Sequence, residues 1–277
     1  MAETEEFNII VRDGTRLVGH EWVIDKPAGA VAMIHGLGEH SRRYDHVARF
    51  FNENGFSYYA IDQRGHGQSE GKRGHTPSHE RMVDDVEEFL MYVRSEENNL
   101  PIFLYGHSMG GNLVSNYVLK KNVNELAGAI ISTPWLKTHI VPPAWQRTMA
   151  RVVSKIFPSF QQNNGLKVEW LTNDPEVNQK YADDPLVHDR ISVRLYLDFV
   201  AEGDWALKSK KKVDVPMFVY HGAEDPIAKQ DSSRSFADSH KVKYILWEKT
   251  KHEPHNDLRK EEVLIAVLNW VNKQIAP

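Results

Sequence analysis

Residues 100–111 read Leu-Pro-Ile-Phe-Leu-Tyr-Gly-His-Ser-Met-Gly-Gly, and this stretch decides the fold. The apolar run at 102–105 predicts a buried strand, and the apolar spacing over 109–121 predicts a helix. Between them lies the G-x-S-x-G pattern of a nucleophile elbow, a tight strand-to-helix turn with Ser108 at its centre. Such a turn strains the serine backbone and requires very small neighbours, which the glycines supply. A chance pair of glycines around a serine is the alternative, and the flanking strand and helix argue against it.

An elbow of this kind also predicts how a negatively charged intermediate would be stabilised. The N–H of Met109 is expected at a helix N-terminus, where it is free to bind an oxyanion. The second donor is expected in the glycine-rich loop after the apolar run 30–34, where the N–H of Leu37 is the candidate. Each such backbone donor is worth about 10²–10³-fold in rate.

The rest of the chain predicts an α/β fold with a mostly parallel central sheet flanked by helices. Asp13-Gly14 marks a hairpin between the first two predicted strands. Predicted strands then alternate with predicted helices, an order typical of a parallel sheet covered on both faces. The further strands are expected at 30–34, 56–61, 126–131, 215–220 and 242–247, and helices at 44–54, 78–95, 232–238 and after 257.

This alternation stops over residues 133–205. No clear strand is predicted there, prolines recur, and helices are expected near 145–157 and 192–207. We interpret 133–205 as a helical cap (lid) inserted into a hydrolase core formed by 1–132 and 206–277. Helices packed at the periphery of the core are the alternative.

Composition narrows the classes of function. The length of 277 residues suits one large α/β domain with an insertion, and a net charge of −4 argues against a nucleic-acid partner. The absence of cysteine excludes disulfides, thiol catalysis and thiolate metal sites. The acidic residues 1–6 lack the apolar core of a signal peptide, and no apolar stretch is long enough to span a bilayer. A cytoplasmic location is therefore expected.

A serine nucleophile needs a base, and the base needs an acid that fixes its tautomer. In elbow-containing folds both follow the serine in chain order. Asp225 comes directly after the predicted strand 215–220 and is held by Pro226, so we expect it to be the acid. The adjacent Glu224 is less suitable because its side chain is longer and less rigid. An ordinary surface aspartate at a turn is the alternative.

The base is expected in the loop at 248–257, after the last predicted strand. This loop contains His252 and His255. We favour His252, and His255 stays the alternative. His221 precedes the proposed acid and is interpreted as a strand-end residue.

Several motifs resemble those of a known family. Residues 35–44, 62–71 and 106–111 look like the monoacylglycerol lipase and lysophospholipase branch of the α/β-hydrolases, the serine aminopeptidase-like superfamily. Residues 183–186 and 252–257 are similar to its later motifs. The resemblance spans most of the chain except the cap, where residues 136–177 match poorly.

This resemblance implies an α/β-hydrolase fold and specific roles for named residues. Ser108 would be the nucleophile, Asp225 the acid and His252 the base, with Leu37 and Met109 as oxyanion donors. Glu39, Arg43, Tyr181 and His255 match positions that line the polar pocket for the glycerol part of the substrate in this family. The expected substrate-binding residues are Glu39, Arg43, His107, Tyr181 and His255.

The predicted function is hydrolysis of single-chain lipid esters through an acyl-serine intermediate, with no cofactor and no metal. General carboxylesterase, lysophospholipase or thioesterase activity is the alternative within enzymes, and a hydrolase-fold receptor for an apolar ligand is the alternative outside them. A zinc site at His252 and His255 is disfavoured, because the zincin spacing is one residue short and a proline intervenes.

The cap sequence leaves a further choice open. Its apolar residues would either roof an acyl tunnel or form ordinary core between cap and sheet, and they would also allow a transient contact with a membrane surface. The oligomeric state is not indicated. The apolar cap residues are Ile140, Val141, Trp145, Val152, Val153 and Phe157.

Overall fold

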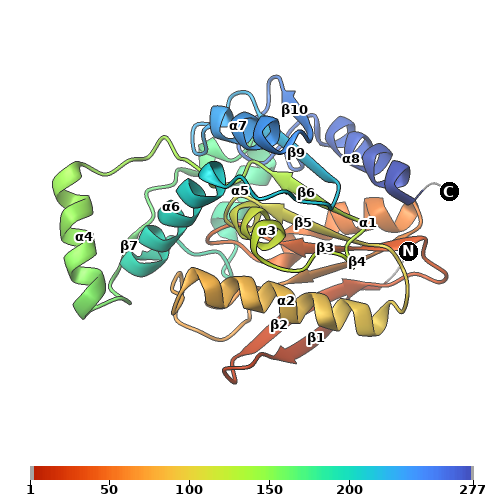
Figure 1. Ribbon diagram of the computed structural model, residues 1–277, viewed down its shortest axis with the longest axis horizontal. Helices are drawn as coiled ribbons and strands as arrows, with labels where there is room; N and C mark the ends of the chain where they lie inside the picture. The colour runs from red at the N-terminus through yellow and green to blue at the C-terminus, as the bar shows by residue number, and fades with distance from the viewer. Residues whose placement is uncertain (1–2, 276–277) are drawn as a thin grey trace.

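The computed structural model describes residues 3–275 and is built on an eight-stranded sheet (Figure 1). The strand order is β1-β2-β4-β3-β5-β6-β9-β10. β1 and β2 form the predicted antiparallel hairpin, β2 pairs antiparallel with β4, and every other neighbouring pair is parallel. The strands are β1 (Glu5–Ile10), β2 (Arg16–Trp22), β3 (Gly29–Ile34), β4 (Phe56–Ile61), β5 (Ile102–His107), β6 (Gly128–Ser132), β9 (Met217–Gly222) and β10 (Lys243–Trp247).

Helices cover both faces of this sheet. Successive residues of an inner strand point to opposite faces, and both sets are apolar, so each face needs a covering layer. In β3, Ala32 and Ile34 belong to the core under α2 (His79–Glu96), α3 (Met109–Lys120) and α7 (Gln230–His240). Val31 and Met33 face α1 (Asp45–Glu53) and α8 (Lys260–Ile275). A short 3₁₀ turn, η1 (Ser41–Tyr44), precedes α1. The predicted mostly parallel, helix-covered sheet is therefore confirmed.

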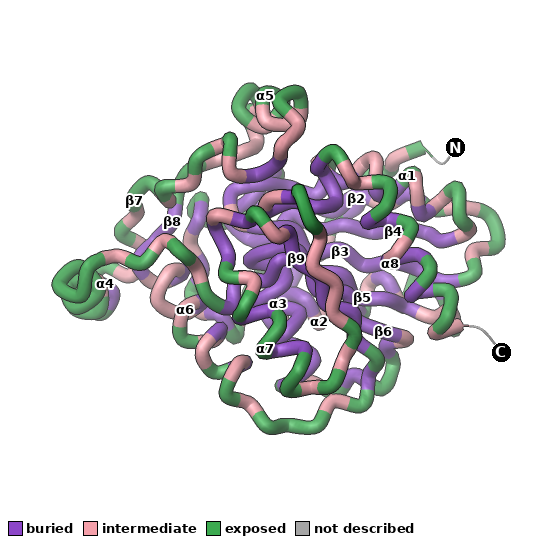
Figure 2. Tube along the Cα trace, turned by 90° about the horizontal axis from the view of Figure 1, so that it is seen from above, coloured by how far each residue is buried: buried purple, intermediate pink, exposed green. Residues whose placement is uncertain are grey.

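The chain leaves the sheet between β6 and β9, which are parallel neighbours. It forms α4 (Ala144–Ile156), β7 (Gln161–Asn163), the 3₁₀ turn η2 (Val168–Trp170), α5 (Pro175–Asp183), β8 (Arg190–Ser192) and α6 (Val193–Lys208). Figure 1 shows α4 at the edge of the molecule, away from the sheet. In Figure 2, α4 and α5 are largely exposed while the strands of the sheet are buried.

The expectation of no strand in this segment is wrong, because β7 and β8 pair antiparallel. Each has only three residues, and β7 consists of amide side chains, so no apolar alternation signals it. Helix α5 was not expected either. Its N-cap is Asp174, whose carboxylate accepts from the N–H groups of Glu176 and Val177, and Pro175 lies in the first turn. Within residues 3–275, no helix combines the length and apolar character needed to cross a membrane.

Candidate active site

Three side chains predicted to act together meet at the carboxyl edge of the sheet. Ser108 follows β5, Asp225 follows β9 and His252 follows β10. The Oγ of Ser108 lies 2.8 Å from Nε2 of His252, and Nδ1 of His252 lies 2.8 Å from Oδ2 of Asp225. All three residues are buried. This is the geometry of a nucleophile, a base and an orienting acid in one hydrogen-bonded chain.

Ser108 sits on a strained turn that only glycine neighbours permit. Its φ of 52° and ψ of −110° lie outside the regions that L-residues prefer. A Cβ added to Gly106 would lie 2.4 Å from the carbonyl oxygen of Gly110, and one added to Gly110 would lie 2.0 Å from that of Ile34. Because both obstacles are backbone, they cannot move aside, and the turn requires glycine at both positions.

We therefore expect Gly110→Ala to lower the free energy of unfolding by about 2 kcal/mol or more, as overpacking against rigid backbone does. Gly111→Ala is the matched control, because its added Cβ would approach Pro134 no closer than 3.0 Å. Urea unfolding followed by circular dichroism measures both. Equal losses for the two variants would contradict the steric argument.

The carboxylate of Asp225 is held in place from two sides. Its Oδ1 accepts from the N–H of Ile227 at 2.7 Å and of Ala228 at 3.1 Å, while Oδ2 faces His252. Burial alone would raise the pKa of Asp225, but the charge of His252 and hydrogen bonds from His221 and His252 hold it well below its ordinary value. Asp225 is therefore an anion that can stabilise an imidazolium.

This anion in turn sets the proton affinity of the imidazole. Burial alone would lower the pKa of His252, but the charge and hydrogen bond of Asp225 outweigh it and raise that pKa above its ordinary value. The Nδ1 of His252 must carry a proton to bond the carboxylate, which leaves Nε2 as the acceptor toward Ser108.

The two predicted oxyanion donors lie beside Ser108. Leu37 lines the same cavity as Ser108, and Met109 begins α3. Within residues 3–275, neither of these two N–H groups donates to an acceptor. The Leu37 loop is fixed by Glu39, whose Oε1 accepts from the N–H of Gly36 at 2.6 Å and from the hydroxyl of Tyr44 at 2.9 Å.

Two of the predicted substrate-binding residues are paired within the protein. Arg43 donates to Oε2 of Glu39 at 2.5 Å and forms a two-pronged ion pair with Glu253, at 2.8 and 2.7 Å. The side chains of Arg43 and Glu39 are 9% and 3% exposed. The guanidinium also stacks 4.6 Å from the ring centre of Tyr181. This arrangement ties the Leu37 loop to the His252 loop, and contact of Glu39 and Arg43 with substrate stays a prediction.

His107 and His255 are fully buried, and neither lines the cavity that opens onto Ser108. The Nδ1 of His107 lies 3.0 Å from the hydroxyl of Thr133. His255 stacks on Tyr44 at 5.1 Å between ring centres, and neither of its ring nitrogens has a hydrogen-bond partner in the described chain. Burial lowers the pKa of His255 to about 3. The rings of His107 and His255 pack together beside His252, and their binding role also stays a prediction.

A small cavity opens onto Ser108. It has a volume of about 100 Å³, and most of its lining is apolar. On one side it shares Pro142, Gln162 and Tyr196 with a cavity of about 240 Å³ beneath α4. The apolar or aromatic residues of the Ser108 cavity are Leu37, Trp135, Ile140, Pro142, Leu166, Ile191, Tyr196, Ile227 and Ala228.

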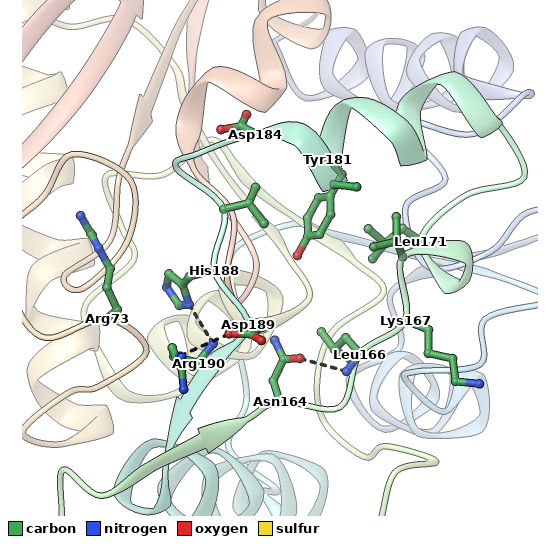
Figure 3. A pocket seen from close by; sticks show the side chains of 13 residues that line it. Arg73, Asn164, Leu166, Lys167, Leu171, Tyr181, Asp184, His188, Asp189 and Arg190 are labelled. Atoms are coloured by element: carbon green, nitrogen blue, oxygen red, sulfur yellow. Dashed lines mark hydrogen bonds and ion pairs between the residues drawn. The ribbon is translucent and has the colours of Figure 1, made fainter.

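On the other side, the Ser108 cavity shares Asn164 and Leu166 with a larger cavity of about 560 Å³, whose lining mixes charged and apolar side chains. Figure 3 shows Tyr181, Asn164 and His188 around this larger cavity. The Oδ1 of Asn164 accepts from the N–H of Leu166 at 2.9 Å, which fixes the orientation of the amide. Ser108 thus lies between a cavity beneath α4 and a larger cavity at the edge of α5 that carries more charged side chains.

The apolar cap residues were expected either to roof an acyl tunnel or to form core between cap and sheet. Neither expectation holds for all six of them. Ile140 lines the Ser108 cavity, and Trp145 and Val153 line the cavity under α4. The other three line neither of these two cavities, and they are exposed rather than packed as core, because α4 projects away from the sheet. Their exposed fractions are 56% for Val141, 56% for Val152 and 67% for Phe157.

Sequence reasoning missed several side chains at this site. Glu253, adjacent to His252, pairs with Arg43, and a buried charge within a polar loop is hard to distinguish from a solvated one by sequence. The hydroxyl of Thr133 donates to the carbonyl of His252 at 2.9 Å. Gln162 and Asn164 reach the cavities from β7 and the residue after it, which the sequence pattern did not reveal. Within residues 3–275, no three His, Asp or Glu side chains are grouped to hold a metal ion.

The chain has the α/β-hydrolase fold, which the solved structures that it resembles share. A family model described as "Serine aminopeptidase, S33" matches residues 25–259, and the chain belongs to this family. A monoacylglycerol lipase of Mycolicibacterium smegmatis is 30% identical over 93% of this chain and 93% of its own. The crystal structure of Paleococcus ferrophilus monoacylglycerol lipase has a TM-score of 0.84 and 32% identity, covering 93% of this chain and 99% of that one.

A longer relative is also similar. An abhydrolase domain-containing protein of Dictyostelium discoideum is 35% identical over 97% of this chain. This chain spans only 29% of the length of that relative.

Proposed function

We propose that the protein is a serine esterase that hydrolyses monoacylglycerols and related single-chain esters through an acyl-serine intermediate. The observation that carries the proposal is the hydrogen-bonded chain from Ser108 through His252 to Asp225, which opens into a largely apolar cavity. The names of similar proteins support the substrate class, since two of them are monoacylglycerol lipases.

In the first half-reaction, Oγ of Ser108 attacks the ester carbonyl carbon while Nε2 of His252 takes the hydroxyl proton. The carbonyl oxygen becomes an oxyanion between the N–H groups of Leu37 and Met109. The bond to the alcohol then breaks, His252 returns the proton to the leaving alkoxide oxygen, and an acyl-serine remains. A water molecule, deprotonated by His252, attacks that ester and releases the fatty acid and Ser108.

The two cavities beside Ser108 support a division of the substrate. We propose that the acyl chain lies in the apolar cavity at Ser108 and continues beneath α4. The glycerol part would leave past Asn164 and Tyr181 through the larger cavity, which is lined by more charged side chains than the cavity beneath α4. We also propose that residues 133–205 act as a cap, because its elements α4, β7 and α6 line the cavity beneath α4.

A panel of esters that share one acyl chain and differ in the alcohol tests this function. It compares a monoacylglycerol, a lysophospholipid, an acyl thioester and a p-nitrophenyl ester, with kcat/KM as the measured quantity. The monoacylglycerol is expected to be hydrolysed efficiently. Turnover of the synthetic ester without turnover of the monoacylglycerol would contradict the lipase proposal and favour a general carboxylesterase.

We expect kcat/KM to fall in acid with a midpoint above pH ~6.5, the ordinary value for histidine. The base must be neutral to accept the serine proton, and Asp225 raises the pKa of His252, so activity appears only as the pH rises through that raised value. A pH profile measured well below KM checks this. A midpoint below pH ~6 would contradict the assignment of His252 as the base.

We further propose that α4 makes a transient contact with a membrane surface. Trp145, Met149, Val152 and Ile156 follow helical spacing, and each is more than half exposed. The charged side chains of this helix are all basic: Arg147, Arg151 and Lys155. An apolar stripe on a basic helix is typical of helices that lie in the lipid interface. The cytoplasmic location expected from the sequence stays a prediction.

The double substitution Trp145→Gln with Ile156→Gln is expected to weaken binding to vesicles of phosphatidylglycerol and phosphatidylcholine about tenfold or more, because less apolar area enters the interface. Ile10→Gln is the matched control, since Ile10 is 66% exposed on the edge strand β1. Co-sedimentation with the vesicles measures the binding. Unchanged binding of the double variant would argue against contact through α4.

A further inference from the structure

A second imidazole faces the acid of the proposed triad. His221, in β9, is fully buried, and its Nε2 lies 3.0 Å from Oδ2 of Asp225. This is the same oxygen that faces Nδ1 of His252 at 2.8 Å. Two histidines therefore meet at one carboxylate oxygen, while the other oxygen is held by the N–H groups of Ile227 and Ala228.

The surroundings of His221 determine which nitrogen carries its proton. Nε2 donates to the carbonyl oxygen of Ala228 at 3.2 Å and lies 3.0 Å from Oδ2 of Asp225, so it carries a proton. Nδ1 lies 2.8 Å from the hydroxyl of Ser233, which can donate to it. The Ser233 hydroxyl therefore supports the tautomer that has its proton on Nε2, beside Asp225.

We propose that His221 is a positioning residue for the reaction: it holds Oδ2 of Asp225 toward His252 and shares the negative charge of that oxygen. The proposal rests on the proposed function of Ser108, Asp225 and His252. A carboxylate oxygen has two lone pairs, so Oδ2 can face both imidazoles at once. The proposed chain then runs through five side chains, Ser233, His221, Asp225, His252 and Ser108.

This arrangement has a consequence for the base. The N–H of His221 beside the Asp225 carboxylate draws negative charge away from the side that faces His252. The carboxylate then stabilises the protonated form of His252 less. The other titratable groups around the base are few. Asp225 contacts it, His107 lies 5.0 Å away between ring centres with His255 packed behind it, and Glu253 and Glu39 act at longer range. Removal of the His221 donor should therefore make His252 easier to protonate.

The test compares His221→Phe with His221→Gln in the full chain. Phenylalanine keeps a ring and loses the donor, whereas the glutamine amide can place an N–H near the position of Nε2. For His221→Phe, kcat for a monoacylglycerol should fall about tenfold or more with little change in KM, as misplacement of a catalytic group does. The acid limb of the pH profile, which is the fall of kcat/KM as the pH is lowered, should have its midpoint at a pH about half a unit higher. His221→Gln should restore most of both.

His20→Phe is the matched control, because His20 is also buried and its Nδ1 also lies 2.8 Å from a serine hydroxyl, that of Ser41. This control should leave the acid limb in place. An unmoved limb in His221→Phe, or equal effects of phenylalanine and glutamine, would overturn the proposal and leave His221 as a packing residue.

If His221→Phe does not fold, Ser233→Ala carries the test. This variant keeps the imidazole of His221 but removes the hydroxyl beside Nδ1, so the ring can adopt its other tautomer. The acid limb of the pH profile should then shift in the same direction by a smaller amount. No shift would overturn the proposal. Failure of the proposed function is separate, because it would appear in the wild-type protein as no ester turnover and no labelling of Ser108 by a fluorophosphonate.

Discussion

Ser108→Ala is expected to reduce kcat for monoacylglycerol hydrolysis by about 10⁶-fold, the loss typical of removing a triad nucleophile. Without Oγ, no acyl-serine can form, and only the oxyanion donors and substrate binding remain to assist attack by water. The variant should fold normally, because alanine can occupy the same strained backbone at φ 52° and, among the described residues, the lost hydroxyl bonds only to His252. Steady-state kinetics and thermal unfolding measure the two effects.

Ser115→Ala is the matched control for this substitution. Ser115 is also buried in α3, and its hydroxyl donates to the carbonyl of Gly111, away from the proposed triad. It should keep its activity and its labelling by a fluorophosphonate, while Ser108→Ala should lose both. If the wild-type protein is not labelled at Ser108, the site is inactive, and the alternative of a hydrolase-fold receptor gains support.

The inner strands of the sheet were predictable because they are largely apolar runs that would be unfavourable in contact with solvent. β3, for example, is buried at all six positions, and residues 30–34 of it were predicted. The elbow was predictable for a different reason. The turn sterically requires glycine at two positions, and both glycines can be seen directly in the sequence. In contrast, β7 and β8 pair through only three residues each and are stabilised by their neighbours rather than by their own pattern.

Within the site, residue types were easier to predict than partners. The sequence identified Glu39 and Arg43 as notable, but their pairing depends on Glu253, which is 210 positions from Arg43 in the chain. The interpretation of His221 as a strand-end residue was correct about its place in β9 and incomplete about its contact with Asp225. Such contacts depend on the path of the loop after β9, which bends Asp225 back toward the strand.

The identity of the base is the clearest case in which the sequence left two candidates that the structure separates. His252 and His255 are three residues apart in one loop, and both are buried. Of these two histidines, His252 contacts both Ser108 and Asp225, whereas His255 stacks on Tyr44. The difference follows from the turn that the intervening residues make, in which the N–H of Asn256 donates to the carbonyl of Glu253.

His252→Ala is accordingly expected to lower kcat about 10⁶-fold, comparable to loss of the nucleophile, because the two residues act as a unit. The remaining activity should no longer show the acid limb, since the titrating base is gone. Kinetics over a range of pH, at enzyme concentrations high enough to detect slow turnover, measure both quantities.

His255→Phe is the comparison that decides between the histidines. Phenylalanine keeps the stack on Tyr44, and because neither nitrogen of His255 has a partner within residues 3–275, the change removes no hydrogen bond of the described chain. We expect kcat within about tenfold of wild type, with any larger change in KM, since His255 packs beside the base but does not contact the serine. If His255→Phe instead abolished turnover while His252→Ala remained active, the proton transfer would have to be assigned to His255, and the chain from Ser108 to Asp225 would not be the reaction path.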